Sequence, residues 1–116
     1  MSMREQTYFI LAALLDEPRH GYAIIQKVDE LSQGSVKLAA GTLYAAIDRL
    51  HAKGYVHHVR EEVVNGRARR YYGLTPDGRA AVRAEAERMV AAARVVTEHA
   101  RIARADRRGF GAAVTA

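Results

Sequence analysis

The dipeptide Asn65-Gly66 constrains the fold of this chain more than any other feature of its sequence. Both residues accept the positive φ of a type I′ turn, and Asn-Gly between strand-like runs is the strongest short signal for a β-hairpin. A two-residue loop also sets the register of the two strands. The second strand should end near Leu74, and the predicted pairs are Glu62 with Arg69, Glu61 with Arg70, Arg60 with Tyr71 and Val59 with Tyr72.

Three helical segments are predicted ahead of this hairpin. Residues 4–16 are apolar almost all round, which requires burial on most sides. The segment opened by His20 carries an apolar stripe at helical spacing and reaches a turn at residues 32–35. The third helix is expected from about Ala40 to Lys53, with Leu43, Ile47 and Leu50 facing inward and Thr42, Ala45 and Arg49 on the opposite face.

A long helix should follow the hairpin. Thr75-Pro76-Asp77 supplies a cap, a proline at the first helical position and an early acid. Small and apolar residues then recur at alternate spacings of four and three, which is a heptad seam. The helix should end near Arg104, residues 105–116 should form a frayed tail, and the seam consists of Val82, Ala86, Met89, Ala93, Val96, Ala100 and Ala103.

The order of these elements predicts a mainly α fold with a small β-hairpin, namely a winged helix-turn-helix plus a long C-terminal dimerisation helix. We expect the winged helix-turn-helix over residues 1–75, the dimerisation helix over 76–104 and the tail over 105–116. In such a fold the second helix of the pair enters the major groove of DNA and the wing lies along the backbone or in the minor groove. The net charge of +5 and the pI of about 9.9 favour a polyanionic partner, nucleic acid before membrane.

Several classes of function and location are disfavoured. The longest apolar run, Tyr8 to Leu15, is far shorter than the ~18 residues of a membrane span, and Met1 to Arg4 lacks a signal-peptide pattern. We therefore expect a soluble, cytoplasmic protein. His57 and His58 point to opposite faces of a strand and the other histidines lack ligand spacing, so we expect neither a metal nor another cofactor. With no triad, phosphate loop or cysteine, we expect no enzyme.

The predicted DNA contacts come from the third helix and the wing. Thr42, Tyr44 and Arg49 are the polar side chains that can reach a groove, and Lys37 precedes that helix. Arg67 has no acid across the hairpin, which makes it the clearest candidate for a phosphate contact. Arg69 and Arg70 can either contact DNA or pair with Glu62 and Glu61 across the strands. Tyr72 is expected to pack, and Tyr71 can pack or reach a phosphate.

Two long motifs carry a family resemblance. They read GTLYAAIDRLHAKGYV from residue 41 and GRARRYYGLTPDGR from residue 66, with HGYAIIQKV at residues 20–28. In this combination the chain resembles the PadR family of winged-helix transcriptional regulators, in its compact form with one C-terminal helix. The resemblance implies a dimeric repressor whose last helix packs on the partner's first helix. It also assigns the family's motif tyrosine to Tyr44 and its basic pair to Arg69-Arg70.

The chain departs from the family pattern at three positions. Ala39-Ala40 stands where the family commonly has Ser-Pro, which removes a side-chain cap, and Ala45 replaces a common proline. Some relatives bind flat aromatic effectors in a tryptophan-lined space at the dimer interface. This chain has no tryptophan, so that mode is not supported and any small-molecule effector stays unidentified.

We therefore expect a homodimeric regulator, a repressor, that binds a palindromic operator in double-stranded DNA. The dimer contacts should come from Val82, Ala86, Met89, Ala93, Val96 and Ala100. Two alternatives are a winged-helix module that docks a protein partner and a ligand sensor without specific DNA binding.

Overall fold

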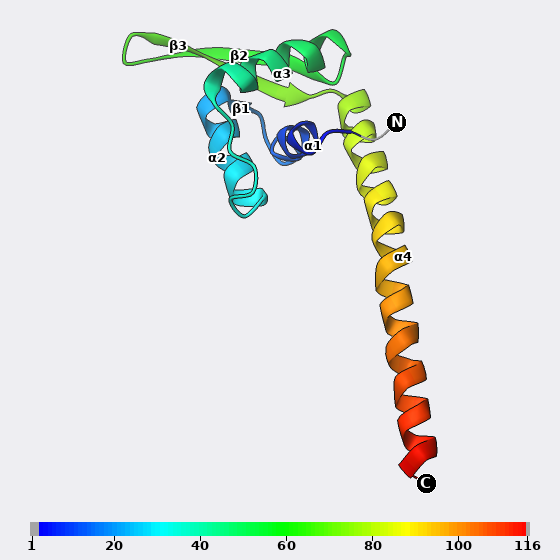
Figure 1. The fold of residues 1–116 in the computed structure, drawn as a ribbon. Helices are drawn as coiled ribbons and strands as arrows, with labels where there is room; N and C mark the ends of the chain where they lie inside the picture. Colours follow the sequence, from blue (N-terminus) through cyan, green and yellow to red (C-terminus); the bar gives the residue numbers. More distant parts are fainter. Residues whose placement is uncertain (1–2, 116) are drawn as a thin grey trace. The chain divides into compact units, whose positions relative to one another are not determined.

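A computed structural model describes residues 3–115 of the chain, with side chains through Arg107. It contains four α-helices and three β-strands within that range (Figure 1). In order they are α1 (Glu5–Ala12), β1 (Arg19–His20), α2 (Gly21–Leu31), α3 (Ala40–Ala52), β2 (Val56–Val64), β3 (Arg67–Leu74) and α4 (Pro76–Thr115). The chain divides into two compact units, Met1–Glu85 and Ala86–Ala116, so the first unit includes the opening turns of α4.

The first unit has one hydrophobic core. The inward face predicted for α3 is confirmed, since Leu43, Ile47 and Leu50 are all buried. The largest fully buried side chains come from α1, α2, α3 and β2, and they are Ile10, Leu11, Ile24, Val28, Leu43, Leu50 and Val56. Val82 of α4 completes this core at 3% exposure. The winged helix-turn-helix is thus held together by apolar contacts among elements distant in sequence.

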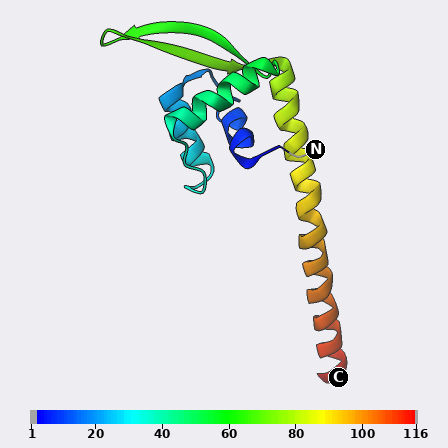
Figure 2. The same ribbon diagram turned by 45° about the horizontal axis from the view of Figure 1, so that its top comes forward.

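The predicted hairpin is present, and it belongs to a three-stranded antiparallel sheet of order β1-β3-β2. Asn65 and Gly66 have φ values of 53° and 77°, as a type I′ turn requires. The register runs as predicted from Val64↔Arg67 to Arg60↔Tyr71, and β3 ends at Leu74. Figure 2 shows the β2–β3 ribbon extending past the helices to its turn.

The register changes beyond Arg60. His58, rather than Val59, is the partner of Tyr72, because a bulge between His58 and Arg60 leaves Val59 without a partner. The predicted Val59–Tyr72 pair is therefore wrong. Strand β1 was also not predicted: it pairs Arg19 with Tyr72 and His20 with Tyr71.

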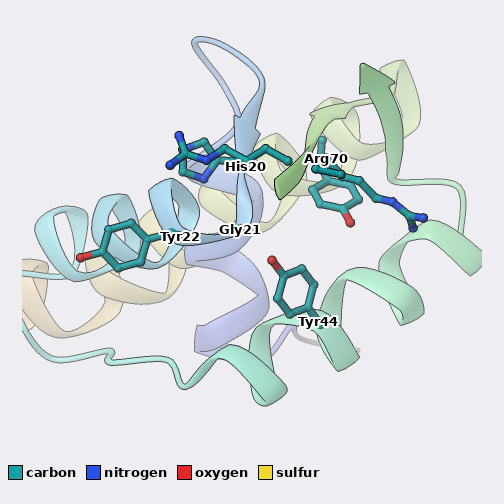
Figure 3. Close-up of a pocket in the computed structure, with 8 residues that line it drawn as sticks. His20, Gly21, Tyr22, Tyr44 and Arg70 are labelled. Carbon is teal, nitrogen blue, oxygen red and sulfur yellow. The ribbon is translucent and has the colours of Figure 1, made fainter. Parts of the chain in front are cut away.

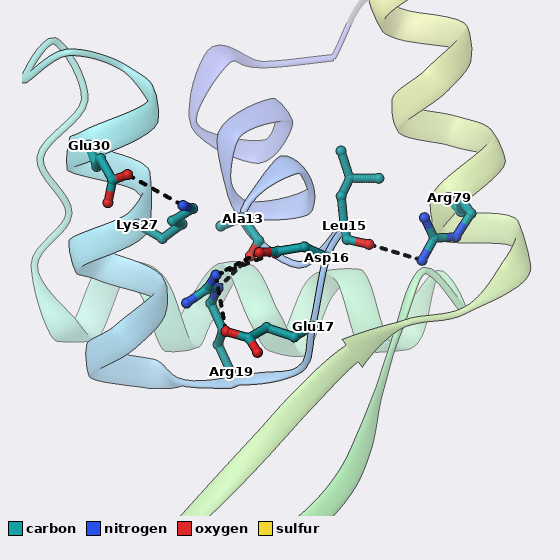
Figure 4. Close-up of polar contacts among 8 residues, drawn as sticks. All are labelled: Ala13, Leu15, Asp16, Glu17, Arg19, Lys27, Glu30 and Arg79. Atoms are coloured by element: carbon teal, nitrogen blue, oxygen red, sulfur yellow. Dashed lines mark hydrogen bonds and ion pairs between the residues drawn. The ribbon is translucent and has the colours of Figure 1, made fainter.

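The segment between α1 and α2 is fastened by Arg19 (Figure 4). Its Nε donates to the carbonyl of Ala13 at 2.9 Å, and its guanidinium forms ion pairs with Asp16 and Glu17 at 3.0 and 3.3 Å. Helix α1 ends at Ala12 instead of the predicted Asp16, because the backbone N–H groups of Leu14 and Leu15 donate to carbonyls three residues back, on Leu11 and Ala12, and not four residues back as in an α-helix.

Helix α4 begins as the sequence predicts. Thr75 Oγ1 accepts from the backbone N–H of Gly78 at 3.0 Å and donates to the carbonyl of Gly54. A Cβ on Gly78 would stand 2.0 Å from the carbonyl oxygen of Tyr55, so glycine is required for this close approach. Arg79 also donates to the carbonyl of Leu15 at 3.2 Å, which ties the start of α4 to the segment after α1.

The end predicted for this helix, near Arg104, is wrong, because the helix continues to Thr115. Alanine and arginine are strong helix formers and no proline follows, so loss of the heptad period does not terminate the helix. None of the described helices is both long and apolar enough to cross a membrane.

Candidate nucleic-acid interface

The outward face of α3 is polar and accessible. Thr42, Ala45 and Arg49 are exposed, and the Tyr44 side chain is 47% exposed. The helix begins at Ala40 after an extended Ala39, and no side chain caps it. The backbone N–H groups at this end therefore lack a side-chain acceptor, and the helix dipole there favours a negatively charged partner.

The wing exposes three arginines that the sequence singled out. Arg67, Arg69 and Arg70 lie on β3 and are exposed, and among the described side chains none of them forms an ion pair. The Cα pairings of Arg69 with Glu62 and Arg70 with Glu61 are present, but the side chains do not follow them.

Glu62 is instead engaged by Arg60. The Arg60 Nε lies 3.0 Å from Glu62 Oε1, and its guanidinium stacks 4.1 Å from the centre of the Tyr71 ring. The hydrogen bond from Arg60, followed by one from Tyr71, lowers the pKa of the Glu62 carboxyl. The acid that faces Arg69 across the strands is thus paired with another cation, and the ring of Tyr71 stacks on that cation.

Lys37 is placed less favourably than the wing arginines. Its Nζ lies 2.9 Å from Asp29 Oδ2, although the side chain is 72% exposed. A phosphate contact from Lys37 would have to replace this exposed pair, which is worth only ~0–1 kcal/mol.

A groove of about 330 Å³ lies between the N-terminus of α2, helix α3 and strand β3. It is lined by His20, Gly21, Tyr22, Tyr44, Ala68, Arg69, Arg70 and Tyr72. The structure therefore brings together three of the predicted site residues, Tyr44, Arg69 and Arg70. Thr42, Arg49, Arg67 and Lys37 are not part of its lining.

Tyr44 lies against the start of α2 with its hydroxyl directed towards Gly21 (Figure 3). A Cβ on Gly21 would stand 2.3 Å from this hydroxyl oxygen and 2.8 Å from the ring carbon that bears it. Only glycine leaves room for the ring in this position.

His20 connects the groove to the sheet. Its Nδ1 accepts from the backbone N–H of Ala23 at 3.4 Å and so caps α2, while its ring packs edge-on against Tyr71. Burial lowers the pKa of His20, the charge of Arg69 lowers it further, and Glu62 opposes them. Nδ1 can accept this hydrogen bond only when it carries no proton. The helix cap therefore favours the neutral imidazole, and protonation of His20 would remove the cap.

Sequence reasoning did not assign His20, Gly21 and Tyr22 to the site. Tyr22 is 65% exposed, although it lies on a helix with an apolar stripe. The pairing of His20 with Tyr71 brings the start of α2 next to the wing, and no local pattern indicates that pairing. The HGY segment itself was the one available signal.

The residues of the heptad seam differ in exposure. Val82 is buried in the core of its own chain, so the prediction that it lies in a dimer contact is wrong. Ala86 is half-buried, Met89 is 36% exposed and Val96 is 69% exposed, and Ala93 and Ala100 are exposed as well. Over the residues that the structure describes, no group of three or more histidines and acids could hold a metal ion.

Comparison with known proteins gives a consistent result. The model of the PadR-like family of transcriptional regulators matches residues 10–84. Rv3488, a transcriptional regulator of Mycobacterium tuberculosis, is 42% identical over 73 residues, which are 63% of this chain and 64% of that protein. The chain spans less than two thirds of the length of the curated relatives it matches, from 24% to 65%.

Solved structures show the same fold. A PadR-like transcription factor of Bacteroides fragilis aligns with a TM-score of 0.65 at 29% identity, covering 81% of this chain and 87% of that one. Bacillus subtilis PadR, solved in complex with operator DNA, aligns with a TM-score of 0.61 at 21% identity, covering 69% and 45%. The expectation of a regulator and not an enzyme is thereby confirmed, and the chain belongs to the PadR-like family of transcriptional regulators.

Proposed function

We propose that the protein is a sequence-specific regulator that binds double-stranded DNA through α3 and the wing. The observation that carries the proposal is the set of wing arginines without ion pairs beside the exposed face of α3. Phosphate contacts position such a protein on the duplex, and side chains in the major groove read the bases. The proposed contacts are Lys37, Thr42, Tyr44, Arg49, Arg67, Arg69 and Arg70. The operator complex of the Bacillus subtilis relative supports this choice of ligand.

We further propose that the protein acts as a homodimeric repressor on a palindromic operator. Val95 and Val96 in the second unit are 73% and 69% exposed, and burying them against a second copy would stabilise both chains. Small residues at Ala86, Ala93 and Ala100 would let two helices approach closely. A two-fold dimer would present two recognition helices to half-sites about one helical turn apart.

Selection of bound sequences from random duplex DNA tests the function directly. We expect a palindromic consensus, and an affinity for it that falls steeply with salt because several phosphates are neutralised. Recovery of no consensus, together with weak binding that hardly depends on salt, would contradict the proposal and favour a protein-docking module.

A further inference from the structure

We propose that the groove between α2, α3 and β3 binds one backbone phosphate of the DNA, and that Gly21 and Tyr22 at the start of α2 belong to this phosphate site. The inference rests on the proposed function and deepens it. It assigns a ligand group to the groove and adds residues that do not lie on the recognition helix or at the tip of the wing.

The charge of the groove selects an anion. Arg69 and Arg70 line it without an ion pair among the described side chains, and Glu62, which faces Arg69 across the strands, is paired with Arg60. The groove also opens onto the N-terminus of α2, where the helix dipole favours negative charge. Guanidinium groups can bind a phosphate with two parallel hydrogen bonds, as they also bind a carboxylate.

The hydroxyl groups of the groove supply neutral donors. Tyr22 and Tyr44 are 65% and 47% exposed, and among the described residues neither hydroxyl has a hydrogen-bond partner. Burial raises the pKa of Tyr72, so its hydroxyl stays protonated at neutral pH. Three tyrosines and two arginines therefore present donors around one space, and no carboxylate lines it.

Gly21 positions Tyr44 in this arrangement. The hydroxyl of Tyr44 occupies the place where a side chain at residue 21 would begin, at 2.3 Å from an added Cβ. The Tyr44 hydroxyl is at the end of a side chain that is 47% exposed. The ring could therefore rotate away from a larger residue at position 21 at small cost to the fold. Gly21 is thus a positioning residue, and its effect on DNA should depend on Tyr44.

The location of the groove favours a phosphate of the DNA over a free small anion. Its walls are the recognition helix α3 and the wing strand β3, which are the two elements proposed to face the duplex. Its volume of about 330 Å³ is at the lower end of the ~300–1,000 Å³ of small-molecule sites. A strand of DNA lying on α3 and the wing passes this groove, whereas a free anion would lack the other contacts.

Methylphosphonate scanning tests the site. A duplex obtained by selection is prepared as a series in which one phosphate at a time is replaced by a neutral methylphosphonate, and the dissociation constant is measured for each. We expect wild type to lose about tenfold in affinity at the phosphate held in the groove, since hydrogen bonds to charged groups are the strong ones. Arg70→Ala and Tyr22→Phe should weaken binding to the unmodified duplex and lose sensitivity at that same phosphate.

Arg67→Ala is the matched control, because it removes the same charge from the wing, lies outside the groove lining and releases no acid towards Arg69 or Arg70. It should retain full sensitivity at the groove phosphate. Equal sensitivity at every phosphate in Arg70→Ala and wild type would overturn the inference while leaving DNA binding intact. Absence of duplex binding by wild type would instead contradict the proposed function.

A double-mutant cycle tests the role of Gly21. Gly21→Ala should weaken DNA binding about as much as Tyr44→Ala, and adding it to Tyr44→Ala should change affinity less than twofold, because the residue that it displaces is gone. Equal losses in both backgrounds would show that Gly21 does not act through Tyr44.

Discussion

Val82, Met89 and Val96 occupy the same position of successive heptads on one helix, yet their exposures are 3%, 36% and 69%. Val82 belongs to the first unit, where α1, α2, α3 and β2 provide a core for it. Val96 belongs to the second unit, where the described chain is the part of α4 that follows Glu85. The same sequence pattern therefore has a different consequence in each unit, because the pattern states that a face is apolar and does not state what covers it.

The two units also differ in what can stabilise them: packing within the chain for the first, and packing against another molecule for the second. The first unit buries its apolar residues within the chain, so its folding should depend little on protein concentration. A single helix cannot bury its own apolar face, and most helical stability in proteins comes from packing of that face. If the second unit is covered by a second copy, its stability must depend on concentration.

The largest effect should come from a charge on the exposed face of the second unit. Ala93→Glu would bury an unpaired carboxylate in the proposed dimer contact, which is strongly unfavourable, and we expect loss of both the dimer and operator binding. Ala91→Glu is the matched control, since two residues place it about 200° around the helix. Sedimentation and an operator-binding assay on both variants check this. A monomeric Ala93→Glu variant that binds the operator at full affinity would contradict the proposed dimer.

A steric change within the first unit should be severe for folding instead. Gly78→Ala would place a Cβ 2.0 Å from the Tyr55 carbonyl, and backbone cannot move aside as a side chain can. We expect the free energy of unfolding to fall by ~3 kcal/mol, the upper end for overpacking. Gly41→Ala is the control: no atom lies within 4 Å of its added Cβ, and alanine in a helix should be neutral or gain ~0.5–1 kcal/mol. Urea unfolding of both variants measures the difference, and equal midpoints would contradict it.

Base recognition should reside in the first unit. Arg49→Ala and Thr42→Ala should leave folding intact and each reduce discrimination by ~1–3 kcal/mol if the side chain reads a base. Repeating the random-duplex selection with each variant checks this. Retention of the wild-type consensus by both would show that another face of α3 contacts the DNA.

Removing one positive charge should change the salt dependence of DNA binding when the charge lies on the wing, but not when it lies on the second unit. Arg67→Ala should weaken binding to all duplexes similarly and reduce the salt slope by ~1, because a phosphate contact carries no sequence information. Arg94→Ala removes the same charge from the second unit and should leave the slope unchanged. Affinities measured over a salt series decide this, and a lost base preference with an unchanged slope would place Arg67 at a base edge.

The smallest effect should be a pH dependence in the first unit. The pKa of His20 is lowered in the folded protein, by burial and then by Arg69, so the neutral form is favoured on folding. Its contribution is present above the unfolded pKa near 6.5 and is lost as the pH falls through the folded value. His20→Asn keeps a capping oxygen that does not titrate. Unfolding at pH 7.5 and pH 5 should show a smaller loss for His20→Asn than for wild type, and identical losses would exclude His20 as the cause.

Local chemistry explains what could be predicted from the sequence. Asn65-Gly66 determined the turn and the register through Arg60, and Thr75-Pro76 determined the start of α4. The apolar spacing in α3 determined which of its faces is buried, and therefore that Thr42 and Arg49 are exposed. Each of these signals acts within a few residues of the element that it specifies.

Tertiary structure alone decided the remaining features, because they depend on contacts between residues distant in sequence. The bulge that leaves Val59 unpaired and the pairing of His20 with Tyr71 arise from how β3 meets its two neighbours. Those pairings bring Gly21 and Tyr22 beside Tyr44 and the wing arginines, and so create the groove. The burial of Val82 in the core of the first unit is a further example. A heptad pattern shows that one face of a helix is apolar, but it does not show which residues pack against that face.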